Sequence, residues 1–177
     1  MIILIGEGGG GKTAILNELE KRGFEKAINY TTRHIRETEK ENSEYKFVNK
    51  EEFNKMWKQG KLLQRAEFAN EYYGISINSL KENIACISIV DSIKDIKTRA
   101  NELGINNVNI ITFYIYVKEQ ERINRMRKRG DTEENIQKRI LKDLKKFKNA
   151  KSVSDYIVEN NNLEKTVEKI IYLTTKN

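Results

Sequence analysis

The sequence predicts an α/β fold in which a parallel sheet is flanked by helices, and three observations support this prediction. Short aliphatic runs alternate with longer amphipathic stretches, as expected when a crossover helix follows each strand. The first run, Ile2–Ile5, is apolar at every position, which is typical of a strand buried on both faces. The chain has 177 residues and no linker rich in glycine or serine, so we expect one domain with its own core.

The individual elements follow from local patterns. The first strand ends at Gly6, and the next helix is expected from Thr13 to about Arg22, where a basic last turn meets a glycine. Further strands are expected at residues 84–90, 110–117 and 156–158. Further helices are expected at residues 93–103, 119–129 and 132–148. The last of these is expected to start with a capping box from Asp131 to Glu134.

Residues 28–82 depart from this alternation. Polar turns there separate short elements, such as a strand at residues 45–48 and a helix at residues 51–59. Such a stretch between two strands of a parallel sheet predicts a lobe inserted into the domain.

The composition restricts the classes of function. A formal charge of +7, from 33 lysine and arginine residues against 26 aspartate and glutamate residues, favours a polyanionic partner: nucleic acid, a membrane surface or a phosphorylated small molecule. The single cysteine, Cys86, excludes an intramolecular disulfide, and the single histidine, His34, excludes a site with several histidines. The chain is too polar for membrane spans, and the opening apolar run is too short for a signal peptide, so we expect a cytoplasmic protein.

A phosphate-binding loop is expected between the first strand and the first helix. Residues 6–13 match G-x-x-x-x-G-K-[ST] without a gap. The loop glycines would let backbone N–H groups converge on phosphate oxygens; they are Gly6, Gly8, Gly9, Gly10 and Gly11. Lys12 would reach the β- and γ-phosphates, and Thr13 would ligate Mg²⁺. The alternative, a glycine turn that precedes Lys-Thr by chance, does not account for the flanking strand and helix.

An acid is expected near this loop, at the end of another buried strand. Asp91 follows the aliphatic run that begins at Ile84. It could hold magnesium or its bound water, or it could cap the next helix, and the sequence leaves both roles open.

Three arginines share one face of the helix expected at residues 119–129, and a fourth follows after Gly130. They are Arg122, Arg125, Arg129 and Arg139. Their guanidinium groups could surround a transferring phosphoryl group, which such charges stabilise. A solvated basic face is the alternative, but the upstream phosphate loop favours the catalytic interpretation.

Six further motifs occur in a distinctive order. They are Thr31–Arg36 (compare T-T-R-x-P-R), Glu44–Val48 (D-Y-x-F-V), Tyr72–Gly74 (Y-Y-G), Arg125–Gly130 (R-L-x-x-R-G), Asn135–Arg139 (a second arginine segment) and Asp155–Asn160 (D-x-x-I-x-N). In this order and spacing they resemble the guanylate kinase family, and the likeness runs over most of the chain. The resemblance implies a P-loop kinase that transfers the γ-phosphoryl group of ATP to GMP with Mg²⁺, giving ADP and GDP.

The resemblance also implies roles for individual residues. The phosphate of the acceptor would be held by Arg33, Arg36, Tyr45 and Tyr73, although packing is the alternative for the tyrosines. The rest of the acceptor site would comprise Gln64, Ser76 and Asp91. The transferring group would be neutralised by Lys12, Arg125, Arg129 and Arg139, and Asn160 would join the loop in binding nucleotide. The chain would divide into a core (1–29, 83–118 and 141–177), an acceptor-binding lobe (30–82) and a lid (119–140).

The base pocket departs from the family pattern at three places. Gln64 stands where the family has the glutamate that reads guanine, and Asn29 and Ile75 stand at two serine positions. A carboxylate presents two acceptors to the N1–H and N2–H₂ donors of guanine, whereas an amide offers one acceptor and an NH₂ group. The amide could instead pair with an edge such as that of adenine, or Glu67 could restore guanine reading.

Two alternatives to a GMP kinase therefore remain. One keeps the machinery but uses another nucleoside or deoxynucleoside monophosphate, or a ribose bisphosphate, as acceptor. The other is an idle protein-binding module, which the intact phosphate loop disfavours. We expect small-molecule nucleotides as partners, and neither nucleic acid nor membrane; the oligomeric state stays open.

Overall fold

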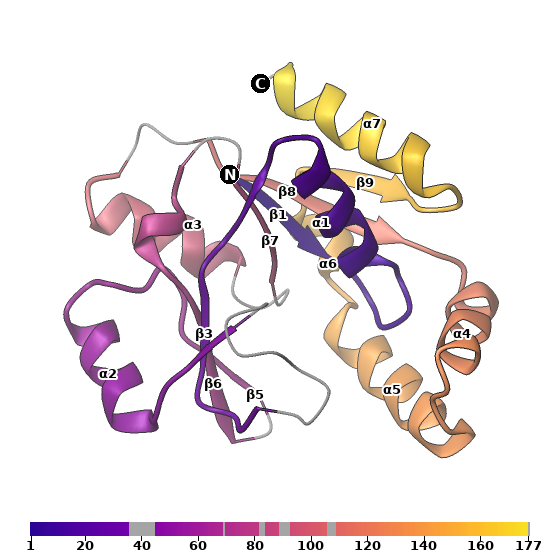
Figure 1. The fold of residues 1–177 in the computed structure, drawn as a ribbon, viewed down its shortest axis with the longest axis horizontal. Coiled ribbons are helices and arrows are strands. Elements are labelled where there is room, and N and C mark those ends of the chain that lie inside the picture. The colour runs from indigo at the N-terminus through magenta and orange to yellow at the C-terminus, as the bar shows by residue number, and fades with distance from the viewer. Residues whose placement is uncertain (36–44, 69, 82–83, 89–92, 106–108, 177) are drawn as a thin grey trace.

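The computed structural model describes residues 1–35, 45–68, 70–81, 84–88, 93–105 and 109–176. Its main sheet is parallel throughout, with the strand order β2-β7-β1-β8-β9 (Figure 1). These strands are β1 (Ile2–Ile5), β2 (Glu25–Lys26), β7 (Ile84–Ile87), β8 (Ile111–Tyr116) and β9 (Tyr156–Glu159). Because β1 is central, the loop that follows it lies in the middle of the carboxyl edge of the sheet, where open α/β sheets bind ligands.

Helices cover both faces of this sheet, as the sequence predicts. The helices of the chain are α1 (Lys12–Lys21), α2 (Lys50–Lys58), α3 (Ile93–Glu102), α4 (Glu119–Lys128), α5 (Glu133–Lys146), α6 (Ala150–Val153) and α7 (Leu163–Thr175), with a 3₁₀ turn at Ile77–Ser79. Figure 1 shows α1 and α7 on one side of the sheet and α3 on the other. The predicted α/β class is therefore confirmed.

Alternate residues of β1 enter two separate apolar cores. Ile2 and Leu4 pack with α1 and α7, among side chains that include Leu19 and Val167. Ile3 and Ile5 pack on the opposite face with a second set of buried side chains, which includes Cys86, Ile93, Ile96 and Ala150. Burial on both faces explains why the strand is apolar at every position.

The predicted inserted lobe contains a second sheet. Its strand order is β4-β3-β6-β5, and its strands are β3 (Asn29–Thr31), β4 (Tyr45–Phe47), β5 (Ala66–Phe68) and β6 (Glu71–Ile75). Helix α2 begins at the N-cap Asn49, whose side chain accepts from the N–H of Glu52. It buries Phe53 against Tyr72, with ring centroids 5.6 Å apart. In Figure 1 this lobe and the pair α4–α5 extend on opposite sides of the phosphate loop.

The start of α5 differs from the prediction. Its N-cap is Thr132, whose hydroxyl accepts from the N–H of Asn135, and not Asp131. Asp131 instead forms an ion pair with Arg129 across the turn, where Gly130 has φ 94°. Because α5 continues to Lys146, it also passes the predicted end of the lid at residue 140.

The other predicted element ends agree with the structure to within three residues. Strand β7 ends at Ile87, and residues 89–92 lie outside the described part of the chain. Helix α7 was not predicted, although Asn162 caps it by accepting from the N–H of Lys165. No helix in the described ranges is long and apolar enough to cross a membrane. Cys86 is buried, which raises the pKa of its thiol to about 12, as suits a structural residue.

Candidate active site

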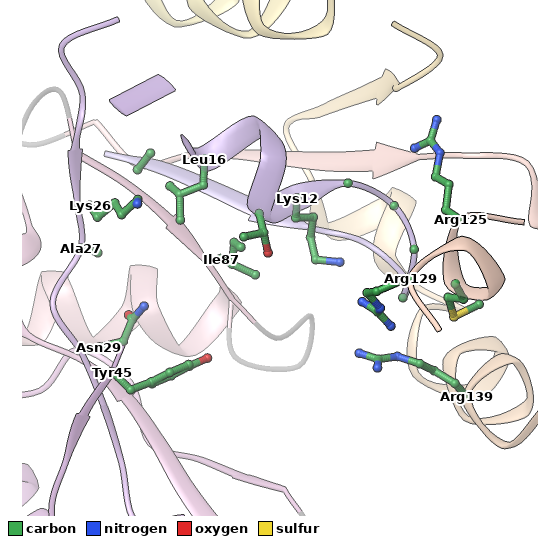
Figure 2. A pocket seen from close by; sticks show the side chains of 17 residues that line it. Lys12, Leu16, Lys26, Ala27, Asn29, Tyr45, Ile87, Arg125, Arg129 and Arg139 are labelled. Atoms are coloured by element: carbon green, nitrogen blue, oxygen red, sulfur yellow. The ribbon is translucent and has the colours of Figure 1, made fainter. Parts of the chain in front are cut away.

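A cavity of about 400 Å³ lies between the phosphate loop, the lobe and the lid helices. The phosphate loop lines it from Gly8 to Thr13, and Arg125, Arg129 and Arg139 line it from the side of α4 and α5 (Figure 2). Asn29 and Tyr45 line it from the lobe. The structure thus places the predicted phosphate loop, three of the predicted lid arginines and Tyr45, one of the predicted acceptor-binding residues, around one space.

The backbone of the phosphate loop requires glycine at several positions. Gly9 and Gly11 have φ of 78° and 83°, which side-chain-bearing residues rarely adopt. A Cβ at Gly6 would lie 2.6 Å from the carbonyl oxygen of Ile115, and one at Gly11 would lie 2.5 Å from Nδ2 of Asn160. The unbroken run of glycines therefore lets the loop fit tightly against β8, β9 and α4.

Lys12 is the first residue of α1, and its side chain folds back along the loop. Its Nζ donates to the carbonyl oxygens of Gly6 at 2.6 Å and Glu7 at 2.9 Å. Burial lowers the pKa of Lys12 to about 8; Asp143 and Glu7 oppose this effect, while Arg139 and Arg122 add to it. An anion in the cavity would favour the charged amine, so this site is prepared for phosphate.

The lid arginines have different surroundings. Figure 2 shows the guanidinium groups of Arg129 and Arg139 on the side of the cavity that Lys12 faces. Arg129 pairs with Asp131, whereas within the described residues Arg139 makes no hydrogen bond or ion pair. Arg125 donates to the carbonyl oxygen of Asn160 at 3.0 Å and pairs with Glu121 at 3.0 Å.

The prediction that Arg122 lies beside the transferring group is wrong. Its side chain is 4% exposed, lies beneath the loop and pairs with Asp143 at 3.7 Å. Arg122 has the same helical spacing as the other arginines, but its guanidinium group is buried and pairs with another residue of the protein.

Two tyrosines and an arginine form the described part of the expected phosphate site for the acceptor. The rings of Tyr45 and Tyr73 meet edge to face, with centroids 6.0 Å apart. The Arg33 guanidinium lies over the rings of Tyr45 and Phe47, at 5.6 and 5.4 Å from their centroids. Figure 2 shows the Tyr45 hydroxyl pointing into the cavity.

Three residues of the expected base pocket are buried: Gln64, Ile75 and Ser76. Gln64 is 3% exposed, and its Oε1 accepts from the hydroxyl of Ser88 at 3.2 Å. The Oδ1 atom of Asn29 is buried and has no hydrogen-bond partner among the residues that the structure describes. Ser76 caps the 3₁₀ turn by accepting from the N–H of Asn78 and does not line the cavity. Glu67, the alternative base reader, lies exposed on β5.

Asn160 supports the loop from below. It is 4% exposed, and its Nδ2 donates to the carbonyl oxygen of Gly10 at 2.9 Å. Its Oδ1 accepts from Thr166 at 3.2 Å. The side chain therefore holds the loop in shape, while its contact with nucleotide stays a prediction.

Arg36 and Asp91 lie outside the described residues, so their predicted roles remain predictions. Among the described residues, no group of three or more histidine, cysteine, aspartate or glutamate side chains is arranged to hold a metal ion. Thr13 lines the cavity with an exposed side chain and remains the candidate metal ligand.

Two acids near the loop were not anticipated. Asp143 accepts from the N–H of Gly8 at 2.7 Å, and Glu7 accepts from the Tyr114 hydroxyl at 2.7 Å. Asp143 lies four residues after Arg139, so the helical period offered a signal for it. No helical spacing of this kind marks Glu7, whose partner Tyr114 lies on β8.

Comparison with known proteins gives a consistent result. The family model described as "Guanylate kinase" matches residues 1–176. A guanylate kinase of Prochlorococcus marinus (strain MIT 9312) is 31% identical over 182 residues, covering 98% of this chain and 95% of the relative. One of Mycoplasmoides gallisepticum is 30% identical over 185 residues, covering 99% and 92%.

Solved structures agree in fold. The crystal structure of guanylate kinase from Anaplasma phagocytophilum matches with a TM-score of 0.67 and 20% identity, covering 99% of this chain and 84% of that one. Shikimate kinase from Acinetobacter baumannii matches with a TM-score of 0.51 and 17% identity, covering 99% and 93%. The family match over nearly the whole chain, together with the phosphate loop and the motifs that line one cavity, shows that this chain belongs to the guanylate kinase family.

Proposed function

We propose that this protein transfers the γ-phosphoryl group of ATP to the phosphate of GMP, giving ADP and GDP, in the presence of Mg²⁺. The observation that carries the proposal is the convergence of Lys12, Arg129 and Arg139 on one cavity, opposite Tyr45. Three cations facing a phosphate loop suit a transferring phosphoryl group, whose transition state spreads negative charge over its oxygens.

The loop and its neighbours would bind the triphosphate of ATP. Backbone N–H groups and the N-terminus of α1 would hold phosphate oxygens, and Lys12 would exchange its carbonyl partners for a phosphate oxygen. Arg139 would contribute most to the transfer, because it has no ion-pair partner within the described residues. Arg129 would first have to leave Asp131.

The hydroxyl of Thr13 fits a magnesium ligand. It lies at the start of α1 and is exposed to the cavity. Mg²⁺ typically takes one or two protein ligands and completes its shell with phosphate oxygens and water, so a single hydroxyl is sufficient. The ion would neutralise charge on the phosphates.

The acceptor would lie against the lobe. Arg33, Tyr45 and Tyr73 would hold its phosphate, because hydroxyls and a forked guanidinium suit a dianion. Arg36, Gln64, Ser76 and Asp91 are proposed to complete the site. Closure of the lobe and the lid around the core would exclude water, so that ATP is transferred and not hydrolysed.

A coupled assay of ADP formation tests this function. ATP and Mg²⁺ are supplied with GMP, dGMP, AMP, IMP, UMP or ribose 1,5-bisphosphate, each offered separately. We expect the highest kcat/KM with GMP. The Lys12→Ala variant should lose transfer while keeping its far-ultraviolet circular dichroism spectrum, and retained transfer would contradict the assignment of the loop.

Gln64 supports a second candidate function, phosphoryl transfer to a substrate other than GMP. Its buried amide accepts from Ser88 and replaces a carboxylate at the position that the family uses to read guanine. A higher kcat/KM with another acceptor in the same assay would make this residue the specificity switch. Inactivity with all six acceptors would favour a protein-binding module.

We also propose that the protein works in the cytoplasm with nucleotides as its partners, and with neither nucleic acid nor membrane. The supply of ATP and Mg²⁺ there supports this setting. The net positive charge of the chain would then attract phosphorylated substrates. Retention on DNA that falls steeply with salt would contradict this part of the proposal.

A further inference from the structure

Gly8 of the phosphate loop is held on both sides by charged side chains from α4 and α5. Its N–H donates to Oδ2 of Asp143 at 2.7 Å, and its carbonyl oxygen accepts from Nη1 of Arg122 at 3.4 Å. The same Nη1 lies 3.7 Å from Oδ2 of Asp143. One ion pair thus joins two helices to the loop.

The burial of the ion pair between Arg122 and Asp143 indicates that it does more than pack α4 against α5. Arg122 is 4% exposed and Asp143 is 8% exposed. Apolar side chains would hold α4 against α5 at least as well, because removing two charges from water offsets much of their attraction. The charged pair adds hydrogen bonds to the peptide groups on either side of Gly8, which apolar side chains could not make.

Glycine at position 8 permits this contact. A Cβ there would lie 2.4 Å from Nε and 2.8 Å from Cδ of Arg139, and 3.2 Å from Oδ2 of Asp143. Arg139 precedes Asp143 by about one turn of α5. The bond that holds Asp143 therefore also fixes where Arg139 enters the cavity.

We propose that Asp143 is a positioning residue for nucleotide binding, which together with Arg122 clamps Gly8 to α5 and so fixes the loop and Arg139 relative to Lys12. The role of Asp143 in phosphoryl transfer rests on the proposed kinase function. Its effect on ATP binding can be measured without any acceptor.

Binding experiments with two variants separate the charge from the hydrogen bond. Asp143→Asn keeps an acceptor for Gly8, whereas Asp143→Ala removes it. Binding of a fluorescent methylanthraniloyl-ATP and of GMP is measured for each variant. We expect Asp143→Ala to bind the ATP analogue about tenfold more weakly, the effect of a lost hydrogen bond to a charged group, with GMP affinity unchanged. Asp143→Asn keeps the acceptor but loses the ion pair with Arg122, so its ATP affinity should lie between those of the wild type and Asp143→Ala.

Asp155 provides a matched control. It accepts from the N–H of Thr112 at 2.8 Å and pairs with Lys97 at 3.0 Å. It lies just before the start of β9, whereas the phosphate loop follows the end of β1, so the two lie at opposite ends of the parallel strands. Asp155→Asn should lower Tm without changing either affinity.

Three outcomes would overturn the proposal. The first is an ATP affinity that is unchanged in both Asp143 variants, with only Tm lowered as in Asp155→Asn. The second is equal weakening of ATP and GMP binding. The third applies if Asp143→Ala does not fold. It is an ATP affinity of Asp143→Asn that equals that of the wild type. Failure of the wild-type protein to phosphorylate GMP would instead contradict the proposed function and would leave these binding results interpretable.

Discussion

Asn160 at the end of β9 donates its side-chain amide to the carbonyl oxygen of Gly10 across 2.9 Å. It also accepts from Thr166 in α7, so the phosphate loop is linked to the last helix through one buried amide. The loop thus takes its shape from both ends of the chain.

Replacement of Asn160 by Ala should therefore weaken ATP binding as well as stability. Loss of the buried hydrogen bond leaves the Gly10 carbonyl without this partner, which should lower the free energy of unfolding by about 1–3 kcal/mol. We expect Tm to fall and the Kd for ATP to rise several-fold, as measured by thermal unfolding and titration. The control is Asn162→Ala, which removes the N-cap of α7. It should lower the free energy of unfolding by about 1 kcal/mol and leave ATP affinity unchanged.

The pKa of Lys12 makes ATP binding depend on pH. In the folded protein it is about 8, against the usual 10.5, so above pH 8 the free protein holds a neutral amine. Phosphates favour the charged form, and ATP binding should then take up a proton. Calorimetry at pH 9 in two buffers with different ionisation enthalpies should give different apparent enthalpies, and the difference should vanish at pH 6.5. Equal enthalpies at pH 9 would show that Lys12 stays charged.

The same pKa predicts the sign of a stability effect. Between pH 8 and 10.5 the unfolded chain binds a proton that the folded protein releases, so this contribution to the free energy of unfolding rises with pH. Relative to Lys12→Met, wild type should gain up to about 3 kcal/mol between pH 7 and pH 10.5 in urea unfolding. A constant difference across this range would contradict the lowered pKa.

Restoration of a carboxylate at residue 64 should strengthen GMP binding. Gln64→Glu would present two acceptors to guanine from a buried position. A charge-assisted hydrogen bond is worth about 1.5–3 kcal/mol, so the KM for GMP should fall about tenfold or more. The KM for ATP should not change. Glu67→Gln is the control, since Glu67 is exposed; loss of GMP use there would identify Glu67 as the base reader.

Gly74 of the Tyr-Tyr-Gly motif should not tolerate a side chain. A Cβ would lie 2.8 Å from the carbonyl oxygen of Gln64 and 2.9 Å from Cζ of Phe53. Gly74→Ala should lower the free energy of unfolding by about 2–3 kcal/mol, because the backbone of Gln64 must move. The control is Gly104→Ala, because a Cβ at Gly104 meets no atom of the described residues within 4 Å. This variant tests the positive φ alone, at a cost of about 1 kcal/mol. Equal losses in denaturant unfolding would refute the steric argument.

The sequence predicted the sheet and the loop because their signals are local. Ile2–Ile5 is apolar throughout and is followed by an unbroken phosphate-binding motif. Arg122 could not be told from Arg125 or Arg129, because all three share a helical face and only the tertiary contact with Asp143 separates them. The N-cap of α5 was misplaced by one residue because Asp131 and Thr132 are both good caps, and Arg129 engages the first.

The strand order has a consequence for the synthesis of this protein. Both neighbours of β1 come much later in the chain, since Ile2 pairs with Ala85 on one side and Ile111 on the other. Strand β1 thus stays without both of its sheet partners until β7 and β8 have been synthesised. Such long-range pairing slows folding and exposes an apolar segment meanwhile. The segment that leads into the phosphate loop is therefore also the part of the nascent chain that most needs protection from aggregation.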